Sequence, residues 1–197
     1  MISATVPAII LAAGASTRMG RPKALLPCGN RTFVRAILET LRDGGIANAA
    51  VVIRPGDTAI ADEIAATGTG RAVINPHAER GQLTSLIAGL DAVDGAGIDA
   101  VLVTLVDIPL IRPATVSTLC ARAAASSATV LRAVHRGRHG HPVIFKRSLF
   151  DALRAADPQV GAKEVVRAAA VEDVEVDDPG VAEDVDTPDD YARVIAR

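Results

Sequence analysis

Short apolar runs alternate with amphipathic segments along the chain. Runs rich in Val, Ile and Ala predict β-strands at residues 8–12, 49–54, 72–75, 100–106, 128–134, 142–145 and 171–176. Apolar positions with helical spacing predict helices at residues 32–43, 58–66, 83–93, 113–125, 147–155, 162–169 and 188–196. The last helix has Thr187 as its N-cap and Pro188 at its first position. Strand and helix therefore alternate over the whole sequence.

This alternation predicts an α/β fold with a doubly wound, mostly parallel sheet and helices on both faces. The runs AIILA and AVLVTLV are almost continuously hydrophobic, as strands covered on both faces require. Shorter strands in residues 140–180 predict a small antiparallel extension. Without a repeat or a linker, residues 1–197 are expected to form a single domain. In such sheets, ligands bind beyond the carboxyl ends of the strands.

Composition and charge narrow the function. The net charge of −2 and the aromatic content of 2% do not suit binding to nucleic acid, which requires a basic surface with stacking aromatic side chains. Cys28 and Cys120 provide neither a disulfide framework nor a Cys-x-x-Cys metal pair. The first apolar run is too short for a signal peptide or a membrane span. We therefore expect a cytoplasmic protein with no membrane or nucleic-acid partner.

Small residues and cations follow the first predicted strand, in AIILAAGASTRMGRPKALLP (residues 8–27). At Gly14, Ala15 and Ser16, backbone N–H groups can approach an anion closely, because no bulky side chain intervenes. Arg18 and Lys23 can neutralise phosphate oxygens that these amides hold. The glycine spacing matches neither the P-loop nor the dinucleotide-binding fingerprint. The segment is therefore predicted to bind phosphate, and a nicotinamide dehydrogenase is disfavoured.

Two aspartates are candidates for a divalent cation. Asp107 ends the predicted strand in VLVTLVDIPLI, and Asp186 lies near the C-terminus in EDVDTPDDY. Mg²⁺ bound with a nucleotide takes one or two protein carboxylates. Asp107 could instead serve as a turn residue, and the segment around Asp186 also reads as a helix start, with Asp184 as a substitute ligand.

Two further segments hold candidate polar residues. Asn75 ends a predicted strand, and Gly81 and Ser85 lie at a helix start, where unpaired N–H groups suit a base, ribose or phosphate. From the residues alone, helix capping is the more common role of that segment. His139 and His141 have the spacing of two metal ligands on a strand, but a third ligand is missing nearby.

The segment LAAGASTRMGRPKALLP resembles the signature loop of the MobA-like nucleotidyltransferases, closest to the molybdenum cofactor cytidylyltransferase branch. The resemblance extends over nearly the whole chain. It implies a Rossmann-like sheet and Mg²⁺-dependent transfer of a nucleoside monophosphate from an NTP to a phosphorylated acceptor. It implies that Lys23, Arg18 and Asp107 are catalytic. The implied nucleotide-binding residues are Leu11, Ala12, Ala13, Gly14, Ala15, Ser16, Arg18, Lys23, Asn75, Gly81 and Ser85.

The resemblance also implies Asp107 and Asp186 as metal ligands and a Gly140-His141-Pro142 segment on the acceptor side. The pair Ala12-Ala13 is similar to the branch that uses CTP. A molybdopterin-type acceptor follows, with a molybdoenzyme or cofactor-delivery protein as a further partner. Ile108 stands where that branch often has Gln, and Ala162 where relatives carry Asp. A sugar or polyol phosphate acceptor, or a nucleotide-binding chaperone without turnover, therefore stays open.

Overall fold

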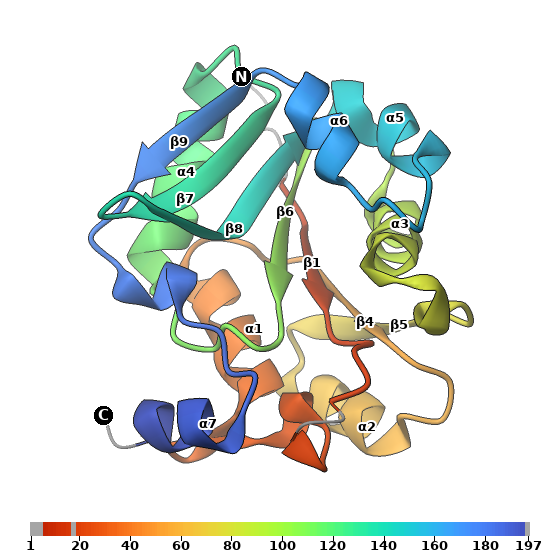
Figure 1. Cartoon of the computed structure of the whole chain (residues 1–197), viewed down its shortest axis with the longest axis vertical. Coiled ribbons are helices and arrows are strands. Elements are labelled where there is room, and N and C mark those ends of the chain that lie inside the picture. Colours follow the sequence, from red (N-terminus) through yellow and green to blue (C-terminus); the bar gives the residue numbers. More distant parts are fainter. Residues whose placement is uncertain (1–5, 17–18, 196–197) are drawn as a thin grey trace.

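A computed structural model of the chain describes residues 6–16 and 19–195. A central sheet of seven strands has the order β5-β4-β1-β6-β8-β7-β9 (Figure 1). All its neighbouring strands run parallel except β8, which is antiparallel to both β6 and β7. The bounds are β1 Ala8–Leu11, β4 Ala49–Ile53, β5 Gly70–Ile74, β6 Ala100–Leu105, β7 Val130–His135, β8 Arg138–Lys146 and β9 Val171–Glu175. The predicted α/β, mostly parallel sheet is confirmed.

The helices cover both faces of the sheet, as predicted. On one face lie α1 (Phe33–Asp43), α2 (Thr58–Thr67) and α4 (Pro113–Ala125); on the other lie α3 (Gln82–Val93), α5 (Phe150–Ala155) and α6 (Lys163–Ala168). Alternate residues of β1 enter the two cores: Ala8 and Ile10 pack towards α1, whereas Ile9 and Leu11 pack towards α3. Burial of both faces explains the continuous apolar runs in the sequence. No helix in the described part of the chain has both the length and the apolar character needed to cross a membrane.

The antiparallel part of the sheet is larger than the sequence predicts. The expected strand at 142–145 is the second half of β8, whose first residues pair back onto β7 from Arg138↔His135 onward. Arg136 and Gly137 form the two-residue turn, both with positive φ. Apolar runs did not predict the first half of β8, because its first residues are polar and lie at the surface.

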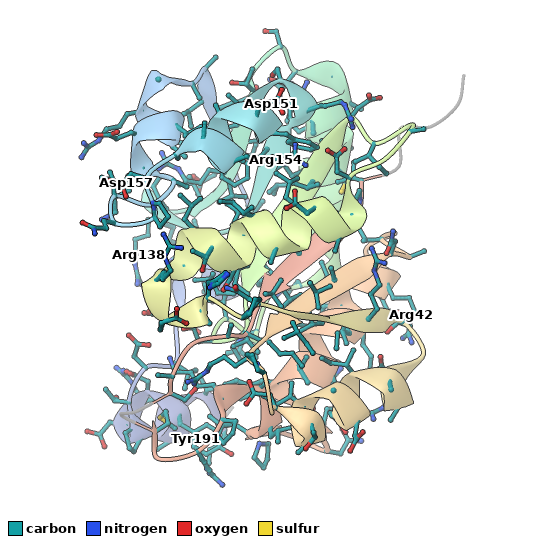
Figure 2. The ribbon with its side chains drawn as sticks, turned by 90° about the vertical axis from the view of Figure 1, so that its right-hand side faces the viewer. Arg42, Arg138, Asp151, Arg154, Asp157 and Tyr191 are labelled. Atoms are coloured by element: carbon teal, nitrogen blue, oxygen red, sulfur yellow. The ribbon has the colours of Figure 1, made fainter. Side chains whose placement is uncertain are left out.

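A second, two-stranded sheet contacts the C-terminal helix. Strands β2 (Pro27–Cys28) and β3 (Arg31–Thr32) flank a Gly29-Asn30 turn, with Gly29 at φ +61°. Helix α7 (Pro188–Ile195) packs against them, and Tyr191, which Figure 2 labels, donates a hydrogen bond of 3.0 Å to the carbonyl of Pro27. Leu26, Phe33, Val185 and Val194 form the buried centre of this contact. The C-terminal helix is thus fastened beside residues 26–33.

The segment between β9 and α7 is held against the sheet at two points of close backbone approach. A Cβ on Gly180 would lie 2.4 Å from the carbonyl oxygen of Leu110, and one on Gly140 would lie 1.8 Å from that of Val181. The buried carboxylate of Asp178 accepts hydrogen bonds from the Arg112 amide (2.8 Å) and the Thr115 hydroxyl (2.6 Å). These contacts fix the path of the chain that leads to Asp186.

Candidate functional site

A cavity of about 330 Å³, here called the loop cavity, lies beyond the carboxyl ends of β1 and β6. This is the edge at which a doubly wound sheet is expected to bind ligands. The loop after β1, the residues after β6, the start of α3 and the C-terminal segment all contribute to its wall. Its lining residues are Leu11, Ala13, Gly14, Ala15, Ser16, Lys23, Ala78, Gln82, Ser85, Leu105, Val106, Asp107 and Asp186.

Lys23 connects the two candidate carboxylates within the loop cavity. Its Nζ lies 3.1 Å from Oδ2 of Asp107 and 2.5 Å from Oδ1 of Asp186. The three residues are separated by 84 and 163 positions in the sequence, so only the fold brings them together. The structure thus places the predicted phosphate-binding cation and the two predicted metal ligands in one hollow.

The charge on Lys23 is stabilised at this position. Burial by itself would lower the pKa of Lys23, but the hydrogen bond to Asp186 and the charge and hydrogen bond of Asp107 raise it above its ordinary value. The ammonium group therefore remains charged at neutral pH. Among the described residues, two carboxylates thus surround one ammonium group at this position.

Asp107 has an oxygen available for a cation. Within the described part of the chain, its Oδ1 is buried and has no hydrogen-bond partner, whereas Oδ2 contacts Lys23. A buried carboxylate oxygen without a partner is costly unless another group binds there. The same part of the chain contains no cluster of three or more His, Cys, Asp or Glu side chains able to hold a metal. The site therefore fits an ion that takes one or two protein carboxylates, and not a site built wholly from side chains.

The C-terminal segment brings Asp186 to this position through backbone contacts. The amide of Val185 donates a hydrogen bond of 2.9 Å to the carbonyl of Asp107 itself. Thr187 accepts from the Asp190 amide, and the Asp190 carboxylate accepts from the amide and hydroxyl of Thr187, forming a reciprocal cap on α7. These bonds to Thr187 lower the pKa of Asp190 to about 2. Asp184 is exposed and does not line the loop cavity, so Asp186 is the better placed ligand.

The loop after β1 is fastened to its surroundings by residues that the sequence did not single out. Arg54, just past β4, donates a hydrogen bond of 2.8 Å to the carbonyl of Gly14. The Ser16 hydroxyl accepts from the Lys23 amide at 3.2 Å. A Cβ on Gly14 would contact nothing within 4 Å, which leaves the backbone there open to the cavity. Arg18 lies outside the described residues, and its role stays a prediction.

The predicted nucleotide-binding residues around α3 divide into two groups. Ser85 lines the loop cavity, but Asn75 is buried and does not: its amide donates to Thr84 and Ser85 at 2.9 Å each, which ties the strand end to the helix. Gln82 lines the cavity and was missed, although it follows the predicted glycine directly. Ala12 is buried in the core and borders a separate cavity beneath the loop.

A second cavity of about 610 Å³, here called the sheet cavity, lies over the antiparallel part of the sheet and shares Leu11, Gln82 and Leu105 with the loop cavity. His141 lines it, and the Nδ1–H group donates a hydrogen bond of 3.4 Å to the carbonyl of Val103. Burial lowers the pKa of His141, so the ring is neutral at pH 7 and Nε2 carries the lone pair. Gly81 also borders this cavity.

The three residues of the predicted acceptor segment have separate surroundings. His141 lines the sheet cavity, whereas Gly140 and Pro142 line neither of the two cavities. Gly140 instead permits the close approach of Val181 described above. Its acceptor contact stays a prediction, while its packing against the C-terminal segment is observed.

Comparison with known proteins gives consistent matches along the whole chain. The chain is 31% identical to nicotine blue oxidoreductase from Paenarthrobacter nicotinovorans, over 96% of each protein. It is 32% identical to 2-C-methyl-D-erythritol 4-phosphate cytidylyltransferase from Cereibacter sphaeroides, over 87% of this chain and 82% of that protein. The crystal structure of Rv0371c from Mycobacterium tuberculosis H37Rv is 28% identical, with a TM-score of 0.85 over 100% of both chains. A structure of Rv0371c in complex with manganese matches with 26% identity and a TM-score of 0.79 over 98% of both.

The family model of the MobA-like NTP transferase domain matches residues 8–174. That range includes the loop after β1, Lys23 and Asp107, while Asp186 lies just beyond it. With the sheet order, the loop cavity and the relatives in agreement, the chain belongs to the MobA-like NTP transferase domain family.

Proposed function

We propose that the protein is a Mg²⁺-dependent nucleotidyltransferase that moves a nucleoside monophosphate, CTP being the favoured donor, to a phosphorylated small molecule. A molybdopterin-type acceptor agrees with the sequence resemblance. The observation that carries the proposal is the cluster of Lys23, Asp107 and Asp186 in one cavity beside the loop after β1. A protein that only stores or delivers a nucleotide has no need of this charge arrangement.

The reaction joins an acceptor phosphate oxygen to the α-phosphorus of the NTP, and the bond from that phosphorus to the β-phosphate oxygen breaks to release pyrophosphate. A phosphate monoester has a second pKa near 6, so at pH 7 its oxygen is already largely ionised and needs little help from a general base. The main requirement is to hold two anions in line and to neutralise their charge. Lys23 and the backbone amides of residues 14–16 are positioned for that task beside the loop cavity.

Asp107 and Asp186 are the residues that would hold Mg²⁺, with Oδ1 of Asp107 as the oxygen that still lacks a partner. The ion would supply positive charge to the phosphate oxygens. The manganese complex of Rv0371c supports a divalent cation in a relative of this size and fold. A chain that binds the ion through one or two carboxylates is expected to bind it more tightly in the presence of the nucleotide.

The name of one relative raises an alternative activity. Nicotine blue oxidoreductase is as similar to this chain as the cytidylyltransferase and covers more of it. The absence of a dinucleotide fingerprint in the sequence therefore does not exclude redox chemistry on this fold. The paired carboxylates around Lys23 favour phosphoryl chemistry, because hydride transfer requires no divalent cation at a carboxylate pair.

A substrate screen tests the proposal. The protein is incubated with Mg²⁺, each of the four NTPs separately and either a molybdopterin-type or a polyol phosphate acceptor, and pyrophosphate is measured. We expect release with CTP above the other NTPs, and none without a divalent cation. Tight nucleotide binding without pyrophosphate from any pair would favour the chaperone. A change in nicotinamide absorbance with a quinone dye, again without pyrophosphate, would favour an oxidoreductase.

A further inference from the structure

The sheet cavity is built mainly from apolar side chains. Its floor is the outer face of the antiparallel strands, with Val103 on β6 and Val143 and Phe145 on β8, and its sides are Leu86 on α3 and Val166 on α6. A volume of about 610 Å³ is in the range of pockets that enclose a small organic molecule. A ligand with many hydroxyl groups would find few partners on such walls, and each unpaired group would weaken binding.

A turn at the mouth of the cavity supports the same conclusion. Pro158 lies over the start of α3, with its carbonyl oxygen 3.2 Å from where a Cβ of Gly81 would be. Figure 2 shows Asp157, just before this turn, on the same side of α3 as Arg154 and nearer to the N-terminal end of that helix. Val160 follows in the turn and is 41% exposed, although it borders the cavity. Val160 thus adds one more apolar side chain to the mouth of the cavity.

The polar side chains that border the sheet cavity are three cations, two glutamines (Gln82 and Gln159) and one histidine. Arg132 already forms an ion pair of 2.8 Å with Asp173. Lys163 and Arg167 on α6 border the cavity and form no ion pair among residues 6–16 and 19–195, and Glu164 on the same helix offsets part of their charge. The neutral His141 offers one hydrogen-bond acceptor. This pattern suits an anionic ligand with an apolar body.

We infer that the sheet cavity binds the acceptor, and that the acceptor is a phosphate monoester with an apolar, ring-sized body and not a sugar or polyol phosphate. The assignment of the cavity to the acceptor rests on the proposed function. Gln82, Leu11 and Leu105 border both cavities, so a ligand in the sheet cavity adjoins one in the loop cavity. The apolar body packs against the strands and the phosphate points towards the loop cavity, while the positive charge of Lys163 and Arg167 favours an anionic ligand over a neutral one.

Binding of model phosphate monoesters tests this inference without nucleotide or metal. The dissociation constants of 1-naphthyl phosphate and glycerol 3-phosphate are measured by calorimetry on the full chain. We expect 1-naphthyl phosphate to bind at least tenfold more tightly. Equal binding of the two esters, or tighter binding of glycerol 3-phosphate, would overturn the assignment.

Matched variants locate the binding. Val160→Ser removes the exposed apolar side chain at the cavity mouth and is expected to weaken 1-naphthyl phosphate about threefold to tenfold. Val171→Ser is its control, because Val171 on β9 is similarly exposed (38%) but does not line the cavity. The double variant Lys163→Gln, Arg167→Gln is expected to weaken 1-naphthyl phosphate by a similar factor and to leave uncharged 1-naphthol unchanged. Unaltered 1-naphthyl phosphate binding in both sets would refute the site.

These outcomes are separable from those of the nucleotide screen. If the naphthyl ester binds as expected but no NTP yields pyrophosphate, the ligand class assigned to the sheet cavity stands and only the transfer reaction is refuted. If pyrophosphate is released with a polyol phosphate acceptor and the naphthyl ester does not bind, the transfer reaction stands and the apolar acceptor is refuted.

Discussion

The loop cavity and the sheet cavity adjoin each other but are lined by different kinds of side chain. The loop cavity gathers Lys23, Asp107 and Asp186 from three distant parts of the chain, and its hydrogen bonds fix every one of them. The sheet cavity is formed by neighbouring strands and by the segment around α6, and most of its wall is apolar. The first has the charges needed for chemistry on phosphate, whereas the second has the shape and polarity that would select a ligand.

This difference indicates how specificity can vary within one fold. The charged cluster depends on contacts across the whole molecule, including the Val185–Asp107 backbone hydrogen bond, and small changes there would disrupt all of it. The wall of the sheet cavity depends on single side chains such as Val160 and Ala162, which can change without disturbing the sheet. Ala162, one of the two positions at which the sequence departs from the pattern that the resemblance implies, lies in the second cavity and not in the first.

The largest effect is expected at Asp107. Asp107→Ala removes the oxygen that lacks a partner and one of the two contacts of Lys23. Loss of one preorganised charge at a phosphoryl centre typically costs about 3–4 kcal/mol, so pyrophosphate release should fall by roughly two to three decades. The measurement is the steady-state rate with CTP and Mg²⁺.

Asp184→Ala is the matched control, because this nearby aspartate is exposed and lies away from the loop cavity. Circular dichroism and thermal unfolding verify that both variants fold. Normal turnover by Asp107→Ala in Mg²⁺ would refute the assignment of Asp107 as a metal ligand.

A smaller loss is expected at Lys23. Lys23→Ala removes the ammonium group between two carboxylates, but leaves the carboxylates and the backbone amides of the loop in place. We expect kcat to fall about tenfold to a hundredfold, equivalent to about 1.4–2.7 kcal/mol, with a smaller change in KM. Lys23→Arg keeps the charge and should recover part of the rate. A change confined to KM would indicate that Lys23 contributes only to substrate binding.

The fold and most of the charged residues of the loop cavity could be predicted because they depend on local sequence patterns. Continuous apolar runs identified the buried parallel strands, and helical spacing placed α4 at its observed bounds. Asp107 stands directly after such a run and Lys23 lies in the segment that follows another, so their position at the sheet edge follows from the strand assignments. That Asp186 meets them required the resemblance, because nothing local in the C-terminal segment indicates where it packs.

The features that were missed depend on contacts between distant backbones. Arg54 contacts the loop through the Gly14 carbonyl, and the sequence gives no sign of this partner. The close approach of Gly140 to Val181 could likewise not be predicted from the Gly-His-Pro motif, because that motif indicated only an acceptor contact. The β2–β3 hairpin is the exception, since the Gly29-Asn30 pair between two short runs is a recognised turn signal in the sequence.

A prediction of intermediate size separates the role of Gly140 in packing from a role in acceptor binding. Gly140→Ala would place a Cβ 1.8 Å from the carbonyl oxygen of Val181, so the C-terminal segment must shift. We expect the variant to lose about 1–3 kcal/mol of unfolding free energy, as overpacked sites commonly do. The midpoint of thermal unfolding should fall by roughly 2–12 °C, followed by differential scanning calorimetry.

Gly95→Ala is the control for this substitution, because a Cβ at Gly95 would meet nothing within 4 Å. Displacement of the segment that carries Asp186 should also reduce the rate of Gly140→Ala at saturating acceptor. A variant with unchanged stability and a raised KM for the acceptor alone would instead assign Gly140 to acceptor binding.

The smallest expected effect is a pH dependence at His141, which links the sheet cavity to the stability of the fold. Burial lowers the pKa of His141, so below the ordinary histidine pKa of about 6.5 the unfolded chain binds more protons at this residue than the folded chain does. The contribution to stability is therefore complete above that value and is lost as the pH falls from about 6.5 towards the lowered pKa. One proton limits the slope of the unfolding free energy to about 1.4 kcal/mol per pH unit.

Urea unfolding of His141→Asn between pH 7 and 5 should show a shallower loss of stability than the wild type, whereas His77→Asn, at an exposed residue, should match the wild type. Parallel pH profiles for the wild type and His141→Asn would mean that His141 can be protonated within the fold, and the neutral hydrogen-bond acceptor assigned to the sheet cavity would be wrong.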